Sequence, residues 1–204
     1  MEFSLISGIS AIYELPGHRL TVIVEDADIA FCENVLVQWK KKLKKEKFQL
    51  PLFLTEEFLE RSLDSFPVEI LEIQKQGQLI AGENIAEKYA VSSEHLRLQL
   101  EREFRGKALR IRQALLEKAV KPKELLAIIH NGMLPFYNAL YYLYHQNYPQ
   151  NEKQLHSGIN EIYPEATFLF SALEQTKITT DTIIDYQKII EKLSQIIDTF
   201  EEEK

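Results

Sequence analysis

Arginine side chains between Ser92 and Lys121 are the residues whose types and spacing best fit a chemical role. Arg97, Arg105 and Arg112 fall on roughly one face of a helix, with Glu101 between them. Guanidinium groups clamp phosphates through paired hydrogen bonds, so this face could form an anion site. The alternative is pairing within the helix, such as Glu101 with Arg105 four residues later. The sequence leaves both interpretations open.

A second concentration of positive charge lies at Lys40 to Lys47, where six of the eight residues are lysines. It could contact phosphate or nucleic acid. Lysines also favour the negative end of a helix dipole, however, and no aromatic residue interleaves with them before Phe48. We therefore expect a solvated helix end.

The residue patterns of common catalytic and metal sites are missing from the sequence. The five histidines form no H-x-x-x-H pair, and Cys32 lies far from all of them along the chain, which disfavours a zinc site. No P-loop and no dinucleotide-binding glycine fingerprint is present. Apolar neighbours predict that His130 is a core histidine. The tyrosine-rich stretch from Tyr137 to Tyr148 favours packing over a cofactor.

Composition places the chain among globular proteins. It has 204 residues, a formal net charge of −7, 45% hydrophobic and 27% charged residues. This length fits one large domain or two small ones. The acidic total argues against a dedicated nucleic-acid-binding protein. We find a single cysteine, no targeting signal and no membrane-spanning run, and we expect a cytoplasmic location without membrane association.

The first 90 residues alternate between strand and helix patterns. Apolar or β-branched runs predict strands at residues 20–24, 50–54, 68–73 and 78–81. Helical spacing over residues 29–43, and a good N-cap at Thr55 ahead of residues 56–64, predict two helices between them. We therefore expect a small mixed-sheet α/β domain over residues 1–90.

From residue 91 onward, the patterns predict only helices. Apolar residues spaced by three and four define one long helix that ends before Pro122, and a second helix begins there and should kink or break near Gly132 and Pro135. Further helices are predicted over residues 136–144, 152–162, 165–175 and from Thr180 onward. An antiparallel helical bundle over residues 91–204 makes the expected fold class α+β.

Several stretches, in order along the chain, resemble the nucleotidyltransferase fold. Ser7 to Ala11 stands where that family has a Gly-Ser turn, and Pro16 to Val24 where it has its Asp-x-Asp strand. Phe66 to Ile73 stands where the strand of the third carboxylate lies, and Gln78 to Glu83 resembles a hairpin return. Leu96 to Lys107 resembles the first bundle helix of bacterial members. The resemblance implies a minimal α/β nucleotidyltransferase domain followed by a helical bundle of the kanamycin-nucleotidyltransferase type.

The resemblance also implies a chemistry whose acids are mostly missing. Nucleotidyl transfer needs carboxylates that hold two Mg²⁺ ions on the triphosphate and on the attacking oxygen. The stretch His18 to Thr21 offers no carboxylate, and only Glu69 could match a family acid. Asp26 and Asp28 have the Asp-x-Asp spacing but follow the strand, where they also predict a helix start. Arg19 would repel a cation and could instead receive a phosphate.

The leading hypothesis is a degenerate, non-catalytic nucleotidyltransferase-like protein that binds a nucleotide, another phosphate ligand or a protein partner. It needs no metal and no other cofactor. Its candidate phosphate-binding residues are Arg19, Arg97, Arg105 and Arg112.

Two alternatives to this hypothesis remain open. One is an active nucleotidyltransferase that acts on a small molecule or a protein, with Asp26, Asp28 and Glu69 as Mg²⁺ ligands. The other is a component of a toxin–antitoxin pair. In every case, the apolar spacing from Ile183 to Phe200 and the tyrosine-rich helix favour a homodimer through the helical half.

Overall fold

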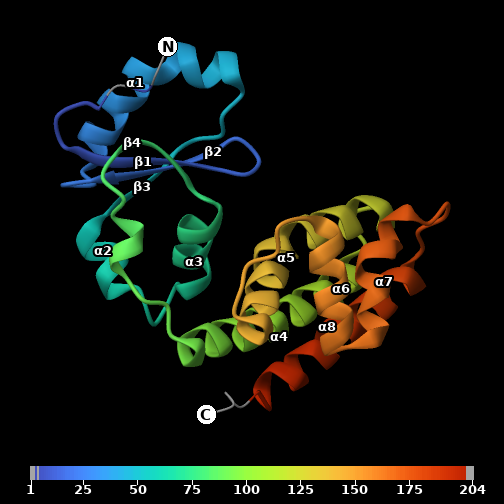
Figure 1. Cartoon of the computed structure of the whole chain (residues 1–204). Helices are drawn as coiled ribbons and strands as arrows, with labels where there is room; N and C mark the ends of the chain where they lie inside the picture. Colours follow the sequence, from blue (N-terminus) through green and yellow to red (C-terminus); the bar gives the residue numbers. More distant parts are fainter. Residues whose placement is uncertain (1–2, 4, 201–204) are drawn as a thin grey trace. The chain divides into compact units, whose positions relative to one another are not determined.

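The computed structural model describes residue 3 and residues 5–200 (Figure 1). Contacts within the chain divide it into two compact units, Met1–Ser92 and Ser93–Lys204. The N-terminal unit contains a four-stranded mixed sheet and the C-terminal unit is helical, so the fold class is α+β. Among the helices of the described residues, none has both the length and the apolar character to cross a membrane.

The N-terminal unit is built on a sheet with the strand order β3-β2-β1-β4. β1 (Ile9–Leu15) and β2 (Arg19–Val24) are antiparallel and joined by a tight turn, in which Gly17 and His18 have positive φ. β4 (Gln78–Gly82) pairs antiparallel with β1, and β3 (Leu52–Thr55) pairs parallel with β2. β3 therefore lies at one edge of the sheet.

Helices cover both faces of this sheet, as Figure 1 shows. Alternate residues of β2 point to opposite faces, because side chains along a strand alternate. Val22 and Val24 pack with α1 (Ile29–Glu46), while Ile23 packs with α2 (Glu56–Arg61) and α3 (Pro67–Gln76). A single 3₁₀ turn, Ala86–Lys88, follows β4.

The prediction of a strand over residues 68–73 is wrong, because this segment lies in α3. Pro67 occupies the first turn of the helix, where its missing N–H costs nothing. Val68 with Leu71, and Ile70 with Ile73, are each three residues apart and buried, as on adjacent helical turns. The strand that the family resemblance places here is therefore absent from the described chain, and Glu69 lies on a helix.

β1 is the strand that the sequence patterns did not predict. Ser7 and Gly8 do form a turn, with Gly8 at a positive φ, but the chain enters β1 directly at Ile9. Ala11 and Tyr13 face α3, whereas Ile12 faces α1, so both sides of this strand are buried. A strand covered on both faces shows no clean alternation of polar and apolar residues, which hides it in the sequence.

The C-terminal unit consists of helices in the order that the sequence predicts. They are α4 (Ser93–Glu117), α5 (Pro122–His145), α6 (Glu152–Ile162), α7 (Thr167–Ser171) and α8 (Thr180–Asp198), with short 3₁₀ turns on either side of α7. α5 continues through Pro135 as one helix, so the expected break does not occur there.

The apolar stripe of α8 is buried within this unit. Ile183, Tyr186, Ile190 and Ile197 are fully buried, and α8 packs along α4. The spacing that favours a homodimer is thus satisfied inside one bundle, and the homodimer stays a prediction.

Candidate functional site

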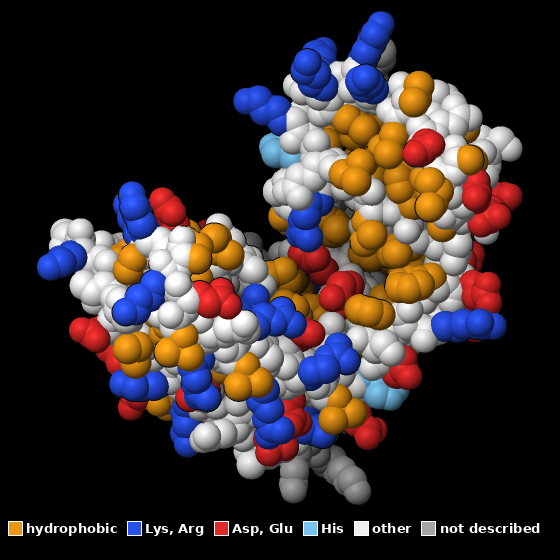
Figure 2. All heavy atoms as spheres, turned by 180° about the vertical axis from the view of Figure 1, so that it is seen from behind, with side chains coloured by type: hydrophobic (Ala, Val, Ile, Leu, Met, Phe, Trp, Pro, Cys, Tyr) orange, Lys and Arg blue, Asp and Glu red, His pale blue; other side chains and the backbone are white. Residues whose placement is uncertain are grey.

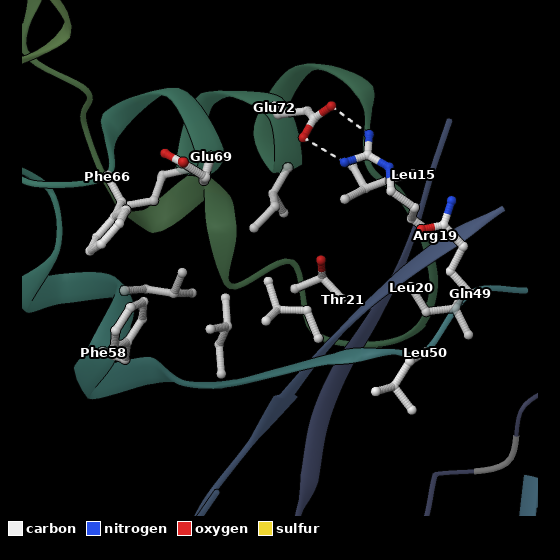
Figure 3. Close-up of a pocket in the computed structure, with 15 residues that line it drawn as sticks. Leu15, Arg19, Leu20, Thr21, Gln49, Leu50, Phe58, Phe66, Glu69 and Glu72 are labelled. Carbon is white, nitrogen blue, oxygen red and sulfur yellow. Dashed lines mark hydrogen bonds and ion pairs between the residues drawn. The ribbon is translucent and has the colours of Figure 1, made fainter. Parts of the chain in front are cut away.

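A cavity of about 360 Å³ opens beside the edge strand of the N-terminal sheet (Figure 3). Its walls are mainly apolar. β1 and β2 contribute to them, and β3, α2 and α3 each supply two apolar residues: Leu52, Leu54, Phe58, Leu59, Ile70 and Ile73. α3 packs on β1, and α2 begins only where β3 ends. On the side of the sheet that carries α2 and α3, no helix of the described residues lies across β3, and this gap forms the cavity.

An ion pair closes one end of the cavity. Arg19, the first residue of β2, donates through Nη1 and Nη2 to the two carboxylate oxygens of Glu72 on α3, at 3.2 and 2.6 Å. Its Nε donates to the carbonyl oxygen of Pro16 at 3.0 Å, which fixes the plane of the guanidinium. The Glu72 side chain is only 10% exposed. The positive charge of Arg19 is thus matched by a buried carboxylate within the same cavity.

Thr21 supplies the other polar group deep in the cavity. It lies two residues after Arg19 on the same face of β2 and is 2% exposed. Figure 3 shows its hydroxyl oxygen directed across the cavity toward α3.

The rim of the cavity is strongly apolar and exposed. Leu50 and Leu52 are 78% and 53% exposed, and Phe58 and Phe66 are each 43% exposed with ring centroids 6.0 Å apart. Figure 2 shows hydrophobic side chains gathered over a broad area of this unit. Exposed apolar patches of this kind often mark binding surfaces.

The three arginines of α4 that the sequence singled out are engaged in ion pairs. Arg97 and Arg105 both contact Glu101, at 3.2 and 2.6 Å. Arg105 also contacts Asp198, and Arg112 contacts Glu191 at 2.7 Å, so both bridge α4 to α8. The pairing of Glu101 with Arg105, which the sequence left open as the alternative to an anion site, is present. A phosphate would have to compete with a carboxylate at each of these positions, and their role as phosphate contacts stays a prediction.

The three acids of the magnesium alternative have different local roles. Asp28 caps α1, where its Oδ2 accepts from the backbone N–H groups of Ala30 and Phe31 at 3.0 and 3.3 Å. Asp26 lies in the loop after β2, and Glu69 lies on α3 at the cavity. In the part of the chain that the structure describes, no three His, Cys, Asp or Glu residues are grouped so that they could hold a metal ion. The helix-start prediction for Asp28 is confirmed.

Two other predictions concern residues away from the cavity. His130 is a buried core histidine, as predicted, and its Nδ1 lies 3.1 Å from the hydroxyl of Tyr186. The lysine run occupies the last turns of α1, where most of its side chains are exposed. Lys42 Nζ lies 3.5 Å from the centre of the Phe3 ring.

Thr21 and Glu72 are the site residues that sequence reasoning missed. Thr21 was counted as part of a buried strand, and Glu72 as a polar residue on a strand that is in fact α3. A signal was present, since Glu72 stands within a run of apolar residues that are all buried. A carboxylate in such surroundings needs a cationic partner.

Comparison of the chain with protein-family models, with curated proteins and with solved structures finds no match. The likeness to nucleotidyltransferases rests on the sequence stretches named above.

Proposed function

We propose that this chain is a non-catalytic nucleotidyltransferase-like protein that acts by binding, and that the cavity of its N-terminal unit takes a small, mostly apolar molecule. The observation that carries the proposal is the doubly hydrogen-bonded Arg19–Glu72 pair inside apolar walls. A volume of about 360 Å³ lies in the range of small-molecule sites, which combine apolar walls with a few polar groups.

The charges of the cavity support an apolar ligand over a nucleotide. A triphosphate needs several cations, or metal ions held by carboxylates. Arg19 is the one cation among the cavity-lining residues, and Glu72 already binds it, while Glu69 adds a further negative charge. Phosphate groups would therefore meet net negative charge.

The acids of nucleotidyl transfer are also poorly placed for catalysis. Asp28 is committed to capping α1, and Glu69 lies on α3. With one carboxylate of the three engaged in helix capping, two Mg²⁺ ions would lack ligands. This supports binding without transfer.

A fluorescence titration tests the proposal, with the neutral apolar dye N-phenyl-1-naphthylamine as the probe. We expect saturable binding of one dye per chain, weakened at least about tenfold by Leu52→Glu, since a charge at the mouth of the cavity disfavours an apolar ligand. Leu109→Glu, at an exposed leucine of α4, is the matched control and should leave dye binding unchanged. Equal binding by the two variants, or tight binding of magnesium ATP that Arg19→Ala abolishes, would reject an apolar site in this cavity.

A protein partner is the second candidate, favoured by the extent of the rim. Leu50 is exposed just before β3, and Leu52 is exposed at the first position of β3, whose outer edge pairs with no other strand among the described residues. Such an edge can add a strand from another chain. A photoreactive benzoylphenylalanine at position 66 should then crosslink to one defined protein in producing cells, whereas the same residue at position 109 should not.

A further inference from the structure

The Thr21 hydroxyl borders the cavity, although the residue as a whole is only 2% exposed. Among the described residues, no side-chain hydrogen bond of Thr21 is found. The neighbouring residues on the same face of β2 do have partners: Arg19 is bound to Glu72, and Ile23 packs in the core. A hydroxyl that faces a cavity and makes no bond within the protein is available to water or to a ligand.

The position of this hydroxyl points to a ligand. Thr21 lines the cavity, and its oxygen faces the open interior toward α3 (Figure 3). Of the α3 residues that line the cavity, Ile70 and Ile73 are apolar, and Glu72 is already bound to Arg19. A molecule that enters between the apolar walls would therefore meet one available donor and acceptor at the inner end.

We propose that the cavity recognises a small neutral molecule with an apolar body and one hydroxyl, carbonyl or amide group, and that this group hydrogen-bonds to Thr21. The inference rests on the proposed function and adds to it the class of ligand and the residue that binds its polar group. Arg19 and Glu72 neutralise each other, so neither is left to compensate the charge of an ionic ligand group. The cavity therefore favours a neutral polar group.

Phenol and toluene form a matched pair of probes for this inference. They have nearly the same shape, and only phenol can hydrogen-bond to Thr21. Their dissociation constants are measured by two-dimensional amide NMR on the full chain, for the wild type, Thr21→Val and Thr21→Ser. Comparing the ratio of the two constants between variants removes the general difference in hydrophobicity between the probes, because that difference is the same for every variant.

We expect the preference for phenol relative to toluene to fall about two- to tenfold in Thr21→Val, which has the same shape without the hydroxyl. Thr21→Ser, which keeps the hydroxyl, should restore most of the preference. Toluene should bind Thr21→Val at least as well as it binds the wild type. An unchanged ratio in Thr21→Val would overturn the inference, and so would binding of the naphthylamine dye without any binding of phenol.

The stability of the free protein provides a second readout. Because the hydroxyl has no partner, Thr21→Val should melt at the same temperature as the wild type or higher. A clear fall in melting temperature would mean that the hydroxyl is satisfied within the fold, which contradicts the inference. Failure of the naphthylamine dye to bind would instead reject the proposed function, so the two claims fail separately.

Discussion

At the scale of single residues, Arg19 and Glu72 decide what the cavity can hold. Glu72 is nearly buried and Arg19 is partly exposed, so the two partners respond differently to the loss of the other. Arg19 can turn toward solvent, whereas Glu72 would be left as a buried charge. Breaking a buried pair from one side is costly, but replacing both partners by apolar residues is often nearly neutral.

Arg19→Met should therefore reduce the free energy of unfolding by about 3 kcal/mol. The double variant Arg19→Met with Glu72→Met should recover a large part of this loss. Urea unfolding measures both, and the exposed pair Arg61 and Glu57, 2.9 Å apart, serves as the control. Arg61→Met should change stability by less than about 1 kcal/mol. Equal losses in Arg19→Met and Arg61→Met would show that the cavity pair is not desolvated.

A second residue-scale prediction concerns the buried chain His130, Tyr186 and Tyr137. Tyr186 Oη lies 3.1 Å from His130 Nδ1 and 2.9 Å from Tyr137 Oη. Burial lowers the pKa of His130 below its usual 6.5, and burial also lowers the pKa of His156. The folded protein thus favours the neutral rings, and the unfolded chain takes up protons first as the pH falls.

Stability should therefore be fully present above pH 7 and should decline as the pH falls below about 6.5, by at most about 1.4 kcal/mol per pH unit for each histidine. Urea unfolding from pH 7.5 to 5 measures this decline. His130→Gln, which keeps an acceptor near Tyr186, should reduce the slope, and His156→Gln should remove part of the remainder. A slope that is identical in the wild type and in both variants would contradict the assignment.

At the scale of elements, the facing sides of α4 and α8 hold the arginines that the sequence offered as an anion site. Glu101 binds Arg97 and Arg105 together, so it is the centre of this network. When Arg105 is removed, Glu101 keeps Arg97. When Glu101 is removed, Arg97 loses its carboxylate partner on α4, and Arg105 keeps its contact with Asp198.

Arg105→Ala should accordingly cost only a few tenths of a kcal/mol, as for an exposed helical ion pair. Glu101→Ala should cost more, because its side chain is only 15% exposed and contacts two cations. Thermal or urea unfolding of the two variants compares them directly. A larger loss in Arg105→Ala than in Glu101→Ala would show that the arginine, not the glutamate, holds this face together.

The elements also show where sequence reasoning succeeds and where it stops. The helices of the C-terminal unit were predictable, because their apolar residues recur every three or four positions. The helix α3 was not, since β-branched Val68, Ile70 and Ile73 mimic a strand and the deciding feature is Pro67 at the helix start. With α3 taken as a strand, the cavity and the pairing of Glu72 with Arg19 could not be foreseen. The cavity and the Arg19–Glu72 pair both depend on the packing of α3 over the face of the sheet that carries Arg19 and Thr21.

At the scale of the whole molecule, charge and apolar surface are distributed unevenly. The chain carries a net charge of −7, yet six lysines gather at the end of α1, and exposed apolar side chains gather around the cavity of the same unit. The apolar stripe of α8, which favoured a homodimer through the helices, is already buried.

The homodimer prediction can be tested by light scattering at micromolar concentration. A dimer that persists in Leu52→Glu and dissociates in a variant with charges on the exposed leucines of α4, Leu109 and Leu116, would support pairing through the helical unit. A monomer at these concentrations would reject it.

The most direct test of the central claim is an amide NMR titration of the full chain with N-phenyl-1-naphthylamine and, separately, with magnesium ATP. We predict that the dye shifts the amide signals of cavity residues, such as Thr21, Leu54 and Ile70, and leaves those of Arg97, Arg105 and Arg112 unchanged. ATP at millimolar concentration should shift neither group. Saturable ATP shifts at Arg19 or at the α4 arginines, with no effect of the dye on the cavity, would contradict a binding site for apolar ligands and restore the phosphate-binding hypothesis.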